Sequence, residues 1–470
     1  MPFPFTLPTT SAASFSSSVD CLSHPSLPLT AATYRGVVRD ALKKHKRLSP
    51  TEQTHHVSLV STALSNYLPY LLALDAGLNN HRQQRPPSVN AVMVDVPSFR
   101  WRPSLCESPV PGRRISHVRV AGLDAEVAFA AVTLANCYAL QARAALHPLY
   151  ATSGTPISAE ARVAAIQAAT RLLLDAASVC TYAADRTDGN GASASVPCIE
   201  VSPAAARALA ALNMAEATML AVFKDDPYPA AVAQNRNADD REWMYKAPDI
   251  PKVRAHLFAR LCLAAADHAA RASALFTTAT TASGHKLDSD LIKYITGLRQ
   301  SCRAKACRLF GIDADLGGQM GMAIGWLNAG LQELGIDARD LGKKSGSSSF
   351  GKLRRDWAEK REDKRVEQST GWGADGGKIE ESRVIYMLHA KWTKTNDTML
   401  AQAIPTPAAL LGQMPSGREI HAVKAFTVPQ LDPAVLDTMR APPDPTEVYA
   451  AGGEASSDEE ANDNAGRAYY

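Results

Sequence analysis

The stretch RAHLFARLCLAAADHAARASALF, residues 254–276, is apolar around most of a helical circumference. At about 100° per residue, Arg260, Asp267 and Arg271 line up on one stripe, which must face water. The opposite side carries the residues predicted to face a core: Phe258, Cys262, Ala269 and Phe276. The stretch therefore predicts a long helix with one buried face, and it favours an all-helical scaffold.

Leu257 and Leu261 belong to neither face of this helix. They project about 60 to 100° from the polar stripe, one turn apart, and the small residues Ala264 and Ala265 follow them. This places both leucines on the rim of the buried face. Two interpretations remain open: the pair covers a neighbouring helix, or it lines a groove that receives an amphipathic partner helix. Periodicity alone favours packing.

Similar three-to-four spacing of apolar residues runs through most of the chain, in segments poor in glycine and proline. Ser49, Pro50 and Glu52 form a capping-box pattern at the start of one such segment. The predicted helices cover residues 32–46, 50–78, 123–146, 158–185, 203–223, 251–280, 287–310, 317–334 and 379–400.

Valine and aromatic residues alternate in VNAVMVDVPSFRW, residues 89–101, and ISHVRV follows at 115–120. This pattern predicts a small β-hairpin or sheet near residues 88–121. Small and polar stretches at 185–197, 224–251 and 343–352 predict loops. Beyond residue 429 the chain becomes proline-rich and then acidic. We therefore expect a disordered tail over 430–470, after a domain that spans 1–429.

The composition is typical of a globular protein, since 46% of the 470 residues are hydrophobic. The 50 basic and 47 acidic side chains leave a net charge of only +3. A chain with so small a net charge has no overall positive electrostatic field that would attract nucleic acid or an anionic membrane. Lys43, Lys44 and Lys46 nevertheless form a local basic run. Eight cysteines without a CxxC pair predict reduced, buried thiols. No apolar run reaches the length of about 18 residues that spans a bilayer, so we expect no transmembrane segment.

The residues give little sign of catalysis. Adjacent His55 and His56 lack a metal-binding spacing, so neither a metal nor a cofactor is predicted. The glycines of residues 317–325 follow no strand and precede no Gly-Lys-Ser/Thr, which indicates close helix packing rather than a phosphate loop. We predict that the chain is not an enzyme. The alternative is a catalytic or small-molecule-binding helical protein with a pocket near His268 and Trp326.

Several segments resemble the Bro-type domain family, to which ALIX and the yeast Bro protein belong. ALNMAEATMLAVFKD at 211–225 and LFARLCLAAADHA at 257–269 resemble its paired helices. FRWRPSL at 99–105, followed by the helix at 123–146, resembles its aromatic β-hairpin and Glu-led helix. KTNDTMLAQAIPTPAALL and REIHAVKAF, within residues 394–426, resemble its C-terminal segment. The resemblance covers residues 1–429.

The resemblance implies a mainly α, curved, boomerang-shaped domain with tetratricopeptide-like helical hairpins and no catalysis. It also implies a groove that binds the C-terminal amphipathic helix of an ESCRT-III subunit of the Snf-seven class. The hydrophobic groove positions of the family correspond here to Val222, Leu257 and Leu261. A fourth groove position, a leucine in the family, corresponds to Ala422.

Within that family the chain most resembles fungal regulators of the response to ambient pH. The resemblance lies in MPFPFTLPTTSAASF at 1–15, TYRGVVRDALKKHKRL at 33–48 and YLPYLLALDAGL at 67–78. It implies a cytoplasmic adaptor of alkaline-pH signalling that works with other components of that pathway. We expect its recruitment to cortical sites of the plasma membrane or to endosomes to depend on partners.

Overall fold

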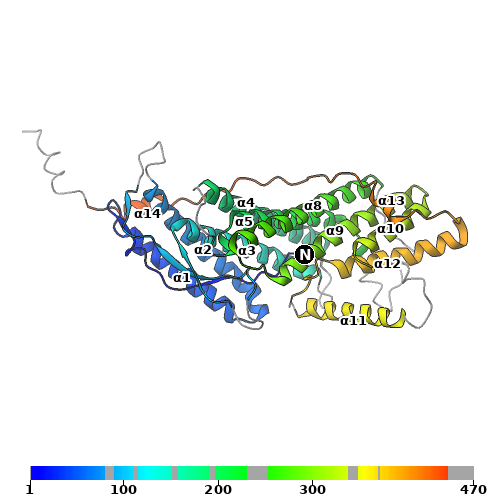
Figure 1. The fold of residues 1–470 in the computed structure, drawn as a ribbon, viewed down its shortest axis with the longest axis horizontal. Coiled ribbons are helices and arrows are strands. Elements are labelled where there is room, and N and C mark those ends of the chain that lie inside the picture. Colours follow the sequence, from blue (N-terminus) through cyan, green and yellow to red (C-terminus); the bar gives the residue numbers. More distant parts are fainter. Residues whose placement is uncertain are drawn as a thin grey trace, which may run out of the picture.

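The structure is a computed structural model, and it describes residues 2–79, 89–108, 115–150, 157–189, 196–229, 252–336, 348–368 and 371–442. These form an elongated helical body, with α1 and α2 at one end and α10 and α12 at the other (Figure 1). Its long helices are α1 (Leu27–Arg47), α2 (Pro50–Leu78), α3 (Leu123–Leu146), α4 (Ala159–Gly189), α5 (Pro203–Asp225), α8 (Lys252–Ser283), α9 (Ser289–Leu316), α10 (Met320–Glu333), α11 (Ser348–Glu367) and α12 (Lys378–Thr395).

All nine helices predicted from the sequence are present, and the mainly α class is confirmed. The Ser49 backbone N–H donates to the Glu52 carboxylate at 2.9 Å, which confirms the capping box at the start of α2. Two loop predictions are partly wrong, because residues 185–189 continue α4 and residues 348–352 begin α11. Most of the predicted loop at 224–251 lies outside the described residues.

The sheet predicted near residues 88–121 is confirmed as β3 (Ala91–Met93), β4 (Ser98–Arg102) and β5 (Val118–Ala121). Two N-terminal strands that the sequence did not predict complete it. These are β1 (Thr9–Thr10), which pairs antiparallel with β4, and β2 (Val19–Cys21), which pairs antiparallel with β3. The order is β1-β4-β5 in one sheet and β2-β3 in the other. Strands of two or three residues are too short to show an alternating pattern.

Helix α8 joins two hydrophobic cores. Its later residues, including Ala269 and Phe276, pack in a first core with α1 to α5 and the sheet. Its earlier residues, including Phe258 and Cys262, pack in a second core with α9, α10 and α12. Asp267 and Arg271 are exposed and Arg260 is half-buried, so the polar stripe and the core face predicted for α8 are confirmed.

Four helical segments are long and apolar enough to cross a membrane by length and composition alone: 50–78, 123–149, 159–188 and 203–225. The expectation that the chain has no such run is therefore wrong. Between 44% and 78% of the most apolar window of each segment is buried inside the fold. Packing between neighbouring helices accounts for much of this apolar character.

All eight cysteines are buried and unpaired, as predicted. The prediction for the glycines of residues 317–325 is confirmed only in part. A Cβ at Gly321 would lie 2.3 Å from the Ala403 carbonyl oxygen, so this glycine lets an extended segment, rather than a helix, approach α10. Gly318 instead has a positive φ of 73°, which a side chain rarely adopts.

Residues 401–442, which we call the C-terminal strap, run along the molecule from α10 back to the N-terminal end (Figure 1). The strap contains α13 (Pro407–Leu411) and α14 (Pro433–Asp437), and the Ala441 backbone N–H donates to the Ser23 carbonyl at 2.8 Å. Residues 430–442 thus pack on the folded body, although the sequence placed them in the tail. The division at residue 429 stays a prediction, and residues 443–470 lie outside the described part.

Candidate partner-docking site

The helices α5 and α8 pack side by side and carry three of the four predicted groove residues. Val222 of α5 is 0% exposed and Leu261 of α8 is 2% exposed, and both belong to the second core. Leu257 is half-buried and packs on that core, as does half-buried Met219. The structure therefore leaves Leu257 of α8 and Met219 of α5 half-buried on a core that contains Val222 and Leu261, and we call these two residues the docking surface.

The placement of Leu261 on the rim of α8 is wrong. Leu261 lies in the core because α5 and α9 pack on either side of α8. A helical wheel orders residues around one helix but carries no information on how many neighbours surround it. Leu257, one turn earlier, does lie at the edge of the buried face.

The C-terminal strap covers the next turns of α8. A Cβ at Gly417 would lie 2.5 Å from the Ala264 backbone nitrogen, so the strap backbone rests directly on α8 at its small residues. The Arg418 N–H donates to the Arg260 carbonyl at 3.0 Å, and the Arg260 side chain donates from Nε to the Ser416 carbonyl at 3.1 Å. The surface above Ala264 is therefore filled by this chain's own strap. No sequence pattern linked residues so far apart.

The fourth groove position, Ala422, is exposed on the strap. The strap follows α8 in the direction of the helix, since Gly417 lies on Ala264 and Glu419 pairs with His268 at 3.0 Å. His421, the residue before Ala422, hydrogen-bonds to the backbone of Ala217 in α5, so the strap crosses from α8 onto α5 at this point. Ala422 therefore lies on the strap where it passes α5, the helix that also carries Val222.

A buried ion network lies behind the docking surface, and we call it the Arg308 network. Arg308 of α9 donates to Asp226 at 2.5 Å and to Glu381 of α12 at 2.6 Å, and Lys305 lies 3.5 and 3.3 Å from the same two carboxylates. Burial opposes the ionisation of Asp226, but Arg308 and Lys305 outweigh it and hold its pKa below the ordinary value. Because Asp226 directly follows α5, this network fixes the end of the helix that carries Val222.

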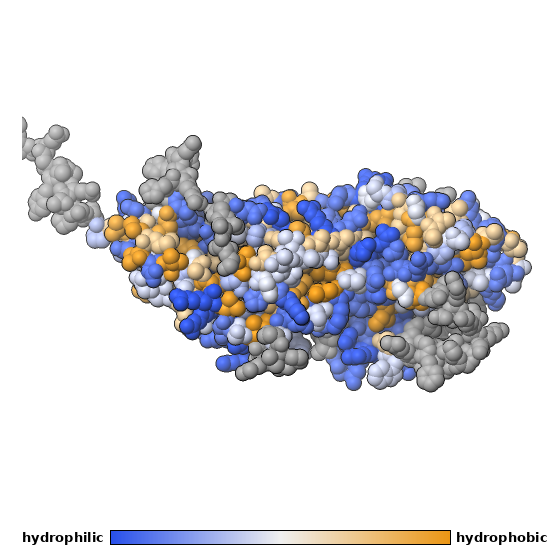
Figure 2. All heavy atoms as spheres, viewed as in Figure 1, coloured by the Kyte–Doolittle hydropathy of each residue, from blue (hydrophilic) through white to orange (hydrophobic). Residues whose placement is uncertain are grey.

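The two residues named for an alternative catalytic pocket both have partners in the fold. Trp326 is buried against Phe310, with ring centroids 5.0 Å apart, and His268 is occupied by Glu419. Among the described residues, no group of three or more His, Cys, Asp or Glu side chains is placed to hold a metal. Figure 2 shows apolar and polar side chains interspersed along the visible face. Hydropathy alone therefore does not locate a docking surface.

Comparison with known proteins gives one full-length relative. The chain is 37% identical over 487 aligned positions to the pH-response regulator protein palC of Emericella nidulans, and the match covers 97% of this chain and 95% of the relative. No family model matches the chain.

Solved structures of ALIX share the fold at low sequence identity. The chain superposes on the ALIX BRO1 domain solved as a complex with CHMP4C, with a TM-score of 0.50 and 14% identity, over 92% of this chain and 96% of that one. It also superposes on ALIX in complex with the SIVmac239 PYKEVTEDL late domain, with a TM-score of 0.52 and 14% identity, over 95% of this chain and 52% of the longer one. With this fold and the full-length match, the chain belongs to the palC family of pH-response regulators.

Proposed function

We propose that this chain is a non-catalytic adaptor of the alkaline-pH response that docks the C-terminal amphipathic helix of an ESCRT-III subunit of the Snf-seven class. The observation that carries the proposal is the apolar pair Leu257 and Met219, which remains half-buried where α5 and α8 meet. Membership of the palC family supports a regulatory role. The fold shared with an ALIX BRO1 domain solved together with CHMP4C supports a protein partner.

In this proposal the partner helix contacts Leu257 and Met219 and reaches Ala422 on the strap, where the strap passes α5. Val222 and Leu261 belong to the core beneath the docking surface. They are not contact residues, because both side chains are buried. Ala422 supplies less apolar area than a leucine would, so the Leu257 end provides most of the apolar contact.

Electrostatic attraction contributes less than apolar burial. Of the three arginines on this side of α8, Arg254 and Arg271 are exposed, whereas Arg260 already binds the strap. Arg254, one turn before Leu257, is therefore the cation best placed to meet an acidic residue of the partner helix. Raising the salt concentration should weaken binding modestly.

Localisation follows from the partner in this proposal. The adaptor is cytoplasmic, and an ESCRT-III subunit recruits it, with other pH-signalling components, to cortical sites of the plasma membrane or to endosomes. Membrane association is then indirect.

The decisive experiment is a titration of the C-terminal helix peptide of an ESCRT-III subunit of the Snf-seven class into wild-type protein and into Leu257→Asp. Full burial of a leucine contributes about 1.5–3 kcal/mol, so we expect the substitution to weaken binding by at least about tenfold. Isothermal titration calorimetry measures the loss, and circular dichroism shows whether the variant is folded.

The matched control is Ala274→Asp, which adds the same charge at an exposed position of α8 far from Leu257. It should bind like the wild type. Leu257→Ala serves as a milder variant if Leu257→Asp unfolds. Equal binding by the wild type and the folded Leu257 variants, or no binding by the wild type, would overturn the proposed docking surface.

A further inference from the structure

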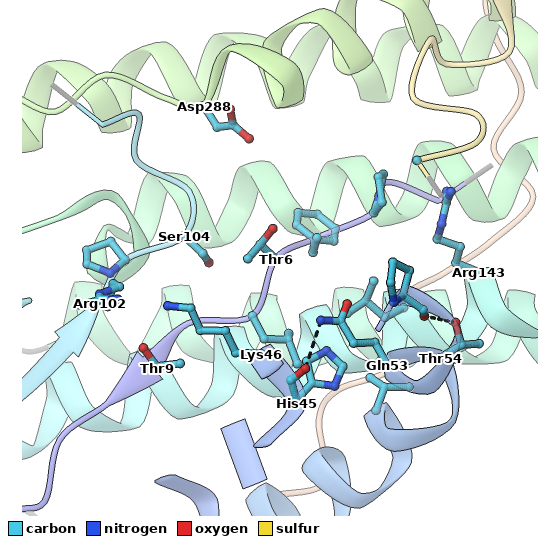
Figure 3. Close-up of a pocket in the computed structure, with 18 of the residues that line it drawn as sticks. Thr6, Thr9, His45, Lys46, Gln53, Thr54, Arg102, Ser104, Arg143 and Asp288 are labelled. Atoms are coloured by element: carbon cyan, nitrogen blue, oxygen red, sulfur yellow. Dashed lines mark hydrogen bonds between the residues drawn. The ribbon is translucent and has the colours of Figure 1, made fainter. Parts of the chain in front are cut away.

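A cavity of about 670 Å³ lies on a part of the molecule that shares no residue with the docking surface. The extended N-terminal segment, Pro4 to Thr9, forms one wall, and the turn between α1 and α2 forms another, with His45, Lys46 and Gln53. The end of β4 and the loop after it contribute Arg102 and Ser104 (Figure 3). Three segments distant in sequence therefore line a space large enough for a small ligand.

Cationic groups gather at the mouth of this cavity. Lys46 and Arg102 line it, and their side chains lie near Ser104 and Thr9 in Figure 3. Partial burial lowers the pKa of the neighbouring His117, and the charges of Arg102, Lys46, Lys43 and Arg100 lower it further. Part of this shift therefore comes from positive charge near the cavity.

Arg143 also lines the cavity, and the nearby charges of Glu216 and Glu362 partly compensate its own. The Arg143 guanidinium donates to the carbonyls of Pro2 and Trp372, which are neutral acceptors. Within the described part of the chain, neither Arg143 nor Arg102 forms an ion pair with a carboxylate. The lining itself holds the three cations Lys46, Arg102 and Arg143 and two acids, Glu107 and Asp288. Glu107 is exposed, and Asp288 lies across the cavity from Lys46 and Arg102 (Figure 3).

Polar atoms in the same wall have unused hydrogen-bonding capacity. The Ser104 hydroxyl and the Arg102 Nε are both buried, and neither has a hydrogen-bond partner among the described residues. A buried donor without a partner costs free energy, which a ligand with suitable acceptors recovers. The hydroxyls of Thr6 and Thr9 also line the space beside them. Cations, hydroxyls and an unpartnered guanidinium N–H are the groups that recognise a phosphate.

We propose that this cavity binds a phosphate monoester carried on a small ring, with Lys46, Arg102 and Ser104 as its ligands. The volume exceeds that of a lone phosphate and accommodates a phosphorylated inositol or sugar. The same chemistry comes from two sources, a soluble inositol phosphate or the headgroup of a phosphoinositide. Binding is independent of helix docking, because Leu257 and Ala422 line neither this cavity nor its mouth.

The test uses the full chain and inositol 1,4,5-trisphosphate, with inorganic phosphate as the smaller probe, in isothermal titration calorimetry at low salt. The wild type should bind the trisphosphate more tightly than phosphate. Arg102→Gln should weaken that binding by at least about tenfold, the loss expected for one charge-assisted hydrogen bond, and Ser104→Ala should weaken it by a smaller factor.

The matched control is Arg119→Gln, which removes the same charge from an exposed position of β5 that does not line the cavity. It should change affinity by less than about twofold, because a solvent-exposed charge is screened. Circular dichroism verifies that each variant is folded. No binding of the trisphosphate by the wild type, or equal losses in Arg102→Gln and Arg119→Gln, would overturn the proposal.

Vesicle sedimentation distinguishes the two sources. Vesicles that contain phosphatidylinositol 4,5-bisphosphate are compared with vesicles that contain phosphatidylserine at the same total charge. Sedimentation with the first only, lost in Arg102→Gln, assigns the site to a lipid headgroup. Trisphosphate binding without sedimentation assigns it to a soluble ligand. Equal sedimentation with both vesicles, unaffected by Arg102→Gln, would contradict a lipid-binding role for the cavity.

Discussion

The N-terminal and C-terminal regions of this molecule each enclose a buried arginine, but they satisfy its charge differently. In the first, Arg35 of α1 donates to Glu126 of α3 at 2.8 Å, and Tyr67 and Trp101 donate to the same carboxylate at 3.1 and 2.6 Å. In the second, Arg308 is held between two carboxylates, Asp226 and Glu381, with Lys305 beside them.

The two regions differ in the hydrogen-bonding and ion-pair partners that each carboxylate would keep if its arginine were removed. Glu126 keeps two neutral donors from the surrounding core, Tyr67 and Trp101. Asp226 and Glu381 keep mainly Lys305, which approaches them at longer distances than Arg308 does. The C-terminal region therefore depends more on exact charge balance, and it is the region that supports the docking surface at the end of α5.

The largest expected effect tests this contrast directly. Arg308→Met removes the central cation and leaves two buried carboxylates with one lysine, so we expect the free energy of unfolding to fall by about 3–5 kcal/mol. Arg35→Met leaves one carboxylate that still accepts two hydrogen bonds, so we expect a loss of about 2–3 kcal/mol. Denaturant unfolding followed by circular dichroism measures both.

A double variant checks whether the Arg308 loss comes from unbalanced charge. Adding Glu381→Gln to Arg308→Met removes one of the two stranded acids and should restore part of the lost stability. If the double variant is less stable than the single one, packing rather than charge governs the C-terminal region. Equal losses for Arg35→Met and Arg308→Met would remove the contrast between the two regions.

The helices and the small sheet could be predicted from sequence because their signals are local. The capping box at Ser49 and Glu52 lies within four residues, and the stripe of Arg260, Asp267 and Arg271 repeats along one helix. The buried state of Leu261 was not predictable in this way, since it depends on α5 and α9 as neighbours. Nor was the strap that covers Ala264, because Gly417 lies far along the chain and glycine indicates close approach without identifying the partner.

The docking surface shows the same division between local and long-range information. Leu257 was identified by its angle on the helix, and Val222 by the family resemblance, but their unequal exposure required the three-dimensional fold. The Arg308 network was missed altogether. Its four members come from three segments, and a single sequence contains no sign that Asp226, Arg308 and Glu381 pair.

A third buried acid, Glu216 of α5, extends the comparison because it forms no ion pair with another described residue. It accepts hydrogen bonds from the Tyr294 hydroxyl at 2.6 Å and the Phe3 backbone N–H at 3.1 Å. Burial raises its pKa from 4.5 to about 7, and those hydrogen bonds offset only part of the shift. The folded protein thus holds this proton more tightly than the unfolded chain does. Stability from this group is full below about pH 4.5 and is lost as pH rises to about 7.

Glu216→Gln should remove this dependence, because the amide stays neutral in the same space. We expect the wild type to lose about 2–3 kcal/mol of stability relative to the variant between about pH 4.5 and pH 8. The difference between the two proteins isolates Glu216 from other groups, such as His45, whose pKa is lowered to about 4 by burial. Parallel denaturant midpoints for the two proteins across this range would show that Glu216 is not the titrating group.

The smallest expected effect concerns the strap, which contacts both regions. It lies against Gly321 of α10 through Ala403 and reaches Ser23 near the N-terminus through Ala441. At Gly417 an added Cβ would lie 2.5 Å from the Ala264 nitrogen and 2.7 Å from its Cα, and neither backbone atom can move without shifting α8. We expect Gly417→Ala to lift the middle of the strap and to cost about 1–2 kcal/mol.

Gly412→Ala is the matched control, since its Cβ would meet nothing closer than 3.5 Å. Limited trypsin digestion should cleave Gly417→Ala faster at Arg418 and Lys424, while Gly412→Ala should be cleaved like the wild type. If the strap merely covers α8, the two core regions keep a single unfolding transition in Gly417→Ala. If the strap couples them, the transition broadens or splits, because the regions then remain linked only through helices that contribute to both cores, among them α5, α8 and α9. Unchanged digestion at both sites would show that the strap contacts adjust to the added methyl group and do not hold the regions together.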